Sequence, residues 1–302
     1  MKTLFKLIKR NSKMFFKDKG TFFVSMITPL ILLILYVTFL GNVYRNSYSA
    51  ALPYGVFMSQ ELMDALVASQ LFSSLLAVCC VTVAFCSNML MVQDKVSGAR
   101  NDLLVAPLSK GKLALSYYIS TFISTFMIAV VATIASFIYL AVVGWYLSFV
   151  DILLIFLDVF LLVMFGTALS SVINHFLSSQ GQISAVGSIV SSCYGFICGA
   201  YMPISSFGLG LQKVLLFLPS TYGTSLIRNH AMRGVFNAME SEGIPLAVID
   251  SFKSSIDCNL EFMGKDVSIS AMYAVMFVSV VLLVGIYILL NVLHKKRGLR
   301  KK

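Results

Sequence analysis

Residues 113–150 read LALSYYISTFISTFMIAVVATIASFIYLAVVGWYLSFV and contain no Asp, Glu, Lys or Arg. An α-helix rises about 1.5 Å per residue, so about 20 apolar residues cross the roughly 30 Å hydrocarbon core of a bilayer. This stretch is long enough to cross with residues to spare. Four further stretches are also free of charge: residues 20–44, 65–93, 159–212 and 267–294. The sequence therefore predicts an integral membrane protein.

The composition of the whole chain agrees with these stretches. Of its 302 residues, 58% are hydrophobic and only 12% are charged, and the mean hydropathy is +0.88. Soluble domains carry about 25% charged residues. Because lipid offers the backbone no hydrogen bonds, spans of this length must be helical. We predict a single all-α membrane domain over residues 1–302 with six transmembrane helices, at about residues 21–40, 66–92, 113–143, 151–173, 181–202 and 269–293.

The basic residues predict the orientation. Most of the 23 Lys and Arg precede the first span, lie between the second and third spans, or follow the last span. By the positive-inside rule, both termini face the cytoplasm. Because these clusters adjoin apolar runs, anionic lipid and topology explain the net charge of +10 better than nucleic acid does. Residues 2–19 are predicted to form an amphipathic helix in the headgroup layer, because their lysines fall on one helical face.

Signatures of catalysis are absent from the sequence. His175, His230 and His294 lie far apart, and the sequence contains neither a His-Glu-x-x-His motif nor a Gly-x-Ser-x-Gly motif. The stretch 109–112 resembles a phosphate loop only superficially, because its single glycine cannot form the required nest of amides. We therefore expect no catalytic residue, no metal site and no ATP site in this chain.

Asp158 is the one acid well inside an expected span. Ionisable groups in the membrane are costly and often functional. A secondary transporter that uses Asp158 therefore stays open as an alternative function, and so does a membrane-integral lipid-modifying enzyme with diffuse motifs.

A polar segment joins the second and third expected spans on the cytoplasmic side. Residues 93–112 read QDKVSGARNDLLVAPLSKGK, in which Pro107 ends an apolar edge formed by residues 103–105. Its central charges alternate in sign: Asp94, Lys95, Arg100 and Asp102. A short helix with an apolar edge and mixed charges suits docking into a groove of a soluble partner. An ordinary solvated loop is the other interpretation.

Before the last span, the sequence predicts an external region over residues 203–268. Residues 207–218 are apolar but too few to cross a bilayer, and they lie between Pro203 and Pro219. We expect them to be re-entrant or interfacial. Residues 229–268 are polar and are expected to form a small external cap.

Taken together, these features resemble the membrane subunits of ATP-binding-cassette exporters of the ABC-2 type. The residues that carry the resemblance are Asp94, Lys95, Gly98, Leu103, Leu104, Pro107, Lys112, Met202, Pro203, Leu218, Pro219, Tyr222 and Arg228. The order of interfacial helix, spans, coupling helix and re-entrant region matches that family over nearly the whole chain. Ala99 and Asn101 depart from it, because the family often has Thr or Ser and an acid at these positions.

The resemblance implies a function and partners. Separate ATPase subunits would bind ATP and Mg²⁺ and contact the coupling segment, residues 93–112, while the permease would pair with itself or a related chain. The implied contact residues are Asp94, Lys95, Gly98, Arg100, Asp102, Leu104 and Pro107. The implied cargo is a drug, peptide, lipid or lipid-linked glycan, exported across a bacterial plasma membrane. Nothing in the spans selects among these cargoes.

Small residues recur in the fifth expected span. They are spaced by three or four positions: Ser184, Ser188, Ser191, Gly195 and Gly199. The last two form a Gly-x-x-x-Gly pattern, which lets helices approach closely. The resemblance would place this stripe at the subunit interface or along the transport pathway. Packing within one subunit is the alternative.

Overall fold

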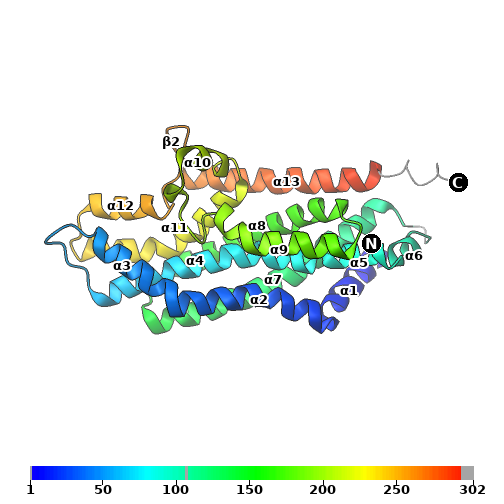
Figure 1. Ribbon diagram of the computed structural model, residues 1–302, viewed down its shortest axis with the longest axis horizontal. Coiled ribbons are helices and arrows are strands. Elements are labelled where there is room, and N and C mark those ends of the chain that lie inside the picture. Colours follow the sequence, from blue (N-terminus) through cyan, green and yellow to red (C-terminus); the bar gives the residue numbers. More distant parts are fainter. Residues whose placement is uncertain (1, 106–107, 294–302) are drawn as a thin grey trace.

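Long helices run side by side along the longest axis of the molecule (Figure 1). The computed structural model describes residues 2–105 and 108–293. We call the two ends of the bundle the coupling end and the cap end. The coupling end holds α1 (Lys2–Lys17), α5 (Met89–Val96) and α6 (Ala99–Val105). The cap end holds α3 (Gly41–Ala51), α12 (Leu246–Ser255) and the last turns of α11 (Pro219–Ser241).

The remaining elements complete the bundle. The long helices are α2 (Lys19–Leu35), α4 (Gln60–Ser87), α7 (Lys110–Val143), α8 (Phe149–Phe176), α9 (Gln180–Ile197) and α13 (Ile269–Leu293). A π-helix, η1 (Tyr36–Leu40), joins α2 to α3. The short elements are η2 (Ile204–Ser206), α10 (Leu209–Leu215) and the antiparallel strands β1 (Glu261–Phe262) and β2 (Lys265–Asp266). The molecule is an all-α integral membrane protein.

Five helical stretches in the described part of the chain are long and apolar enough to cross a membrane. They are Lys19–Ala51, Gln60–Val96, Lys110–Val143, Phe149–Phe176 and Ile269–Leu293. These match five of the six expected spans. The first residues of α1 and the last described residues of α13 lie at the same end of the bundle (Figure 1).

The remaining expected span, 181–202, differs in the structure. Helix α9 ends at Ile197 and is not among the five apolar stretches. The chain then turns, and α11 starts beside the end of α9 and continues to the cap end (Figure 1). Helix α4 packs against both α9 and α11. This traverse of the bundle is thus divided between two helices, so a count of six transmembrane helices stays a prediction.

Residues 229–268, which the sequence assigns to an external cap, begin as part of a bundle helix. Residues up to Ser241 belong to α11, which packs against α4, α8 and α13. Its mean hydropathy is low because it carries Ser, Thr, Asn, Arg and His side chains, many of which are buried. Polar groups that bond within the protein do not need water, so hydropathy underestimated the burial of this helix.

Helix α4 is the centre of the bundle. It is buried over almost its whole length and packs against α2, α7, α8, α9 and α11. Small side chains let the neighbours approach, as at Gly166 of α8, where an added Cβ would lie 3.0 Å from the Cys80 carbonyl of α4. All six cysteines are free. Burial raises the pKa of the Cys258 thiol, in the cap, to about 12, so it stays protonated at neutral pH.

Helix α1 is amphipathic, as the sequence predicts, but it has three distinct faces rather than two. Leu7, Asn11 and Phe15 are buried, and the helix packs mainly against α7. The lysines on the opposite side are exposed, and Phe5 is exposed between these two faces. The apolar residues therefore divide into a protein-facing set and an outward set that can enter a bilayer.

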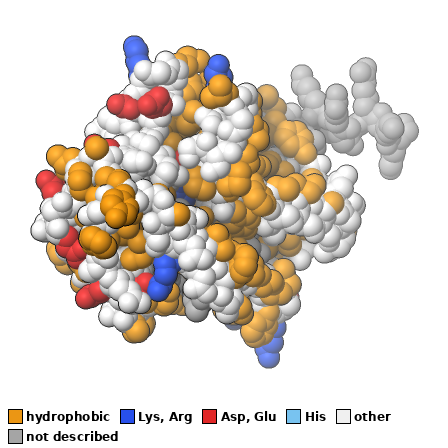
Figure 2. Space-filling view, turned by 60° about the vertical axis from the view of Figure 1, so that its left-hand side comes forward, with side chains coloured by type: hydrophobic (Ala, Val, Ile, Leu, Met, Phe, Trp, Pro, Cys, Tyr) orange, Lys and Arg blue, Asp and Glu red, His pale blue; other side chains and the backbone are white. Residues whose placement is uncertain are grey.

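The two ends of the bundle differ in charge. Side chains of Asp and Glu gather on the cap end, which comes forward in Figure 2. Exposed acids there include Glu61, Glu240, Glu242 and Asp250. The exposed lysines of α1 lie at the coupling end.

Candidate functional site

The coupling segment forms two short helices with a sharp turn between them. Helix α5 continues the direction of α4, and α6 starts after Gly98. Gly98 has a φ of +84°, in the left-handed region that favours glycine. This turn sets α6 at the very end of the bundle (Figure 1).

Asp94 points into the bundle. Its side chain is 3% exposed and accepts hydrogen bonds from Arg10 Nη1 at 2.6 Å and Nη2 at 3.1 Å. The Tyr117 hydroxyl donates to the same carboxylate at 2.6 Å. Paired guanidinium bonds to a carboxylate are strong and directional. Asp94 therefore fixes α5 to both α1 and α7.

Lys95 and Arg100 also bind inside the chain. Lys95 Nζ donates to the carbonyl oxygens of Asn174, His175 and Leu177 at 2.6 to 3.2 Å, which caps the C-terminal end of α8. Arg100 Nη2 donates to Asn291 Oδ1 of α13 at 3.1 Å. Together with Asp94, these residues attach the coupling segment to four other helices.

Other side chains of α6 are free. Asn101, Asp102 and Val105 are exposed, as is Val96 at the end of α5, and Val105 has an exposed fraction of 86%. We call these four residues the coupling face. Leu103 and Leu104 instead pack toward the cluster around Leu7 and Tyr117.

The structure thus divides the seven residues predicted to contact an ATPase. Asp102 lies on the coupling face, and Gly98 forms the turn beside it. Asp94, Lys95, Arg100 and Leu104 face other helices. Pro107 lies outside the described residues. The alternating charges in the sequence did not distinguish internal from outward side chains, because their partners are far away in sequence.

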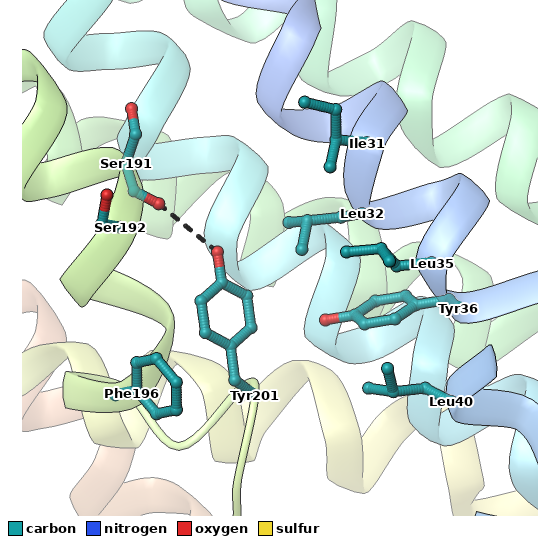
Figure 3. Close-up of a pocket in the computed structure, with 9 residues that line it drawn as sticks. All are labelled: Ile31, Leu32, Leu35, Tyr36, Leu40, Ser191, Ser192, Phe196 and Tyr201. Carbon is teal, nitrogen blue, oxygen red and sulfur yellow. Dashed lines mark hydrogen bonds between the residues drawn. The ribbon is translucent and has the colours of Figure 1, made fainter. Parts of the chain in front are cut away.

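A cavity of about 520 Å³ lies between α2 with η1 on one side and α9 on the other (Figure 3). Leu32, Leu35 and Tyr36 line it from α2 and η1, and Ser191 and Phe196 line it from α9. A second cavity, of about 410 Å³, lies between α3, the turn after α9 and α12, and shares Leu40 and Tyr201 with the first. The two cavities are adjacent, and none of their described lining residues carries a charged side chain.

The stripe of small residues has two parts. Ser184 and Ser188 are exposed on α9, and Ser191 lines the first cavity. An added Cβ on Gly195 would lie 2.3 Å from the Tyr201 ring, so this glycine serves packing within the subunit. Gly199 lies beyond the end of α9 with a φ of +74° and forms a turn. Both glycines of the Gly-x-x-x-Gly pattern therefore have a structural role within the subunit.

Comparison with protein families decides the kind of molecule. The model of the ABC-2 type transporter family matches residues 3–231, which is more than half of the chain. The chain belongs to the ABC-2 type transporter family. It is a permease, the membrane subunit of an ABC transporter. No curated protein matches its sequence.

Asp158 of this permease has two side-chain partners that the sequence analysis did not identify. Asp158 Oδ2 lies 2.6 Å from His230 Nδ1 of α11, and the Tyr273 hydroxyl of α13 donates to Oδ1 at 2.6 Å. The Asp158 side chain is fully buried. The sequence analysis did not pair His230 with Asp158, because it assigned residues 229–268 to an external cap. The cluster joins three helices, and Asp158 lines neither cavity.

Arg228 connects the cap with the spans. It is fully buried and donates to the carbonyl oxygens of Gly199 at 2.9 Å and Ile256 at 2.5 Å. It also bonds Ser74 Oγ of α4 at 3.3 Å and lies 3.5 Å from Asp257. Pro219, as expected for a helix start, is the first residue of α11, and Pro203 precedes η2. The cap end is therefore tied to the bundle centre through Arg228.

Proposed function

We propose that this permease is the transmembrane subunit of an ATP-driven exporter and that separate ATPase subunits dock on its coupling face. The supporting observation is the division within the coupling segment. Asn101, Asp102 and Val105 present an exposed apolar and polar surface, while neighbouring charges are bound internally. A short surface helix of this kind fits a groove on a partner.

The internal contacts give the coupling segment a mechanical role. A push on α6 passes to α13 through Arg100 and Asn291, and to α1 through Asp94 and Arg10. Lys95 carries the same motion to the end of α8. Because these contacts are hydrogen-bonded charges, the segment moves with the helices rather than sliding over them.

The route for cargo follows the two adjacent cavities between α2, η1, α3 and α9. Movement of α1 would reach it directly, because α2 follows α1 after one residue. The exposed hydroxyls of Ser184 and Ser188 are unfavourable against lipid, which supports a second permease copy, or a related chain, against this face of α9.

In this proposal, both termini and the coupling face are cytoplasmic and the cap end is outside. The exposed lysines at the coupling end and exposed acids at the cap end support this orientation in a bacterial plasma membrane. ATP and Mg²⁺ bind to the partner subunits. Residues 109–112 do not fit a nucleotide, because Ser109 caps the first turn of α7 and only one glycine is present.

Copurification from native membranes tests the proposal. Wild-type permease should retain Mg²⁺-dependent ATPase activity, whereas Asp102→Lys combined with Val105→Asp should lose it, because both changes alter only the coupling face. Glu240→Lys, at the exposed cap end, is the matched charge control and should retain it. Retention of the ATPase by the double variant, or cargo export after deletion of the ATPase, would overturn the proposal.

A further inference from the structure

Tyr36 presents a hydroxyl group to the first cavity. The residue is 3% exposed, and its hydroxyl has no hydrogen-bond partner within the described part of the chain. Figure 3 shows this oxygen pointing from the α2 side into the space between the helices, toward Tyr201. Tyr201 differs, because its hydroxyl donates to the Ser191 carbonyl at 3.5 Å. Buried polar groups in proteins nearly always have a partner, so Tyr36 lacks one that a ligand can supply.

The backbone places Tyr36 at an unusual point. It is the first residue of η1, and its N–H bonds the carbonyls of both Leu32 and Leu33. Single π-helical turns within α-helices occur often at functional sites. Leu40, the last residue of η1, lines both cavities, and Tyr48 of the following helix, α3, lines the second.

A second neutral polar group without a partner among the described residues lies at the second cavity. The Tyr48 hydroxyl is buried and makes no hydrogen bond to any described residue. The polar groups aimed at or lining the two cavities are hydroxyls, and the rest of the lining is mainly aliphatic and aromatic.

We propose that the cavity at Tyr36 selects uncharged amphiphilic cargo, with the Tyr36 hydroxyl bonded to a hydroxyl or carbonyl oxygen and the apolar body against Leu32, Leu35 and Phe196. This inference rests on the proposed transport route. A charged group would lose its hydration in the cavity without gaining an opposite charge, because no described lining residue carries one. A neutral oxygen atom loses less hydration free energy on entering the cavity, and it can form a hydrogen bond with the Tyr36 hydroxyl.

Photolabelling of the permease–ATPase complex in phosphatidylcholine nanodiscs tests this assignment. The probes are diazirine derivatives of decanol, decanoate and decyltrimethylammonium, which share a chain and differ in charge. The decanol probe should label residues of α2 and α9 that line the cavity, and excess decanol should compete. The charged probes should not label these residues above the level seen elsewhere on the lipid-facing surface.

Tyr36→Phe removes only the hydroxyl and should weaken competition by decanol about fivefold, as expected for one neutral hydrogen bond. Tyr194→Phe is the matched control, because Tyr194 also has a buried hydroxyl but lines a different cavity. It should leave competition unchanged. Equal competition in wild type and Tyr36→Phe, or equal labelling by a charged probe, would overturn the assignment. Failure of the proposed function would appear separately, as a lack of copurifying ATPase.

Discussion

Two buried carboxylates, Asp94 at the coupling end and Asp158 nearer the cap end, each join three helices but have different partners. Asp94 is held by Arg10, a cation at every physiological pH, and by Tyr117. Asp158 is held by His230 and Tyr273, which can both be neutral. The first joint is therefore an obligatory ion pair, whereas the second connects a carboxyl group to an imidazole and a phenol.

This difference in partners agrees with the role that the proposal gives to each end of the bundle. The joint at Asp94 lies between the coupling face and α1. In the proposal, a displacement of α6 must be passed on to α1 at this point. The joint at Asp158 lies among α8, α11 and α13, away from both cavities, where it need only keep the helices together. Three experiments test this comparison, and one more tests the packing of α9.

The largest expected effect is that of Arg10→Ala. This variant leaves the Asp94 carboxylate almost fully buried with Tyr117 as its remaining partner. Because Asp94 is buried but Arg10 is 30% exposed, the loss should lie at the low end of the cost for a buried ion pair, about 3 kcal/mol. Thermal unfolding in nanodiscs should show a loss of this size, while Lys13→Ala, an exposed change on the same helix, should stay within about 0.5 kcal/mol of wild type. Equal stability of the two variants would contradict the obligatory pair.

Asp158→Ala should cost less, about 2 kcal/mol, because His230 and Tyr273 lose a partner but neither must remain charged. Asp158→Asn keeps a hydrogen-bonding oxygen and should preserve ATP-driven export. The measurements are thermal unfolding and cargo efflux from cells. Loss of efflux in Asp158→Asn with normal folding would favour a proton-coupled transporter instead.

Gly195→Ala tests whether the stripe on α9 packs within one subunit. The added methyl group meets the Tyr201 ring, and overpacking of this kind costs about 1 to 2 kcal/mol. Tyr201→Ala in the same chain should relieve that cost, which a double-mutant cycle measures. If the two effects are additive, Gly195 does not depend on Tyr201, and contact with a second subunit becomes the better interpretation.

Asp18 gives the smallest effect and provides an exposed carboxylate for comparison. It caps α2, and its oxygens accept bonds from the Thr21 hydroxyl and amide, which lower the Asp18 pKa. Asp18→Ala should cost about 1 kcal/mol near neutral pH. Because the folded pKa is depressed, the stability difference should be constant above the ordinary Asp pKa of about 3.9 and shrink as the pH falls through the lower folded value. Unfolding from pH 3 to 8 checks this.

Much of the fold followed from the sequence because lipid leaves few options. Charge-free stretches such as 113–150 must form helices, and the structure has them. The sequence did not predict helix α11, because its polar side chains are buried and form hydrogen bonds with distant parts of the chain. Arg228, for example, bonds carbonyl groups 28 and 29 residues away along the chain.

The site was predicted less completely. The motif located the coupling segment, but a motif does not say which way a side chain points. Asp94 is separated from Arg10 by 84 residues, and Arg100 from Asn291 by 191. Only packing brings these pairs together. The Tyr36 cavity likewise depends on a π-helical turn, for which the sequence gives no signal.

The most direct test of the account is the accessibility of a thiol at position 102. The Asp102→Cys variant is made with Cys193→Ser, because Cys193 is the cysteine exposed among the described residues. A membrane-impermeant maleimide should label this thiol only after cells are permeabilised, and bound ATPase subunits should protect it. Labelling on intact cells would place the coupling face outside, and labelling unaffected by the ATPase would show that nothing docks there.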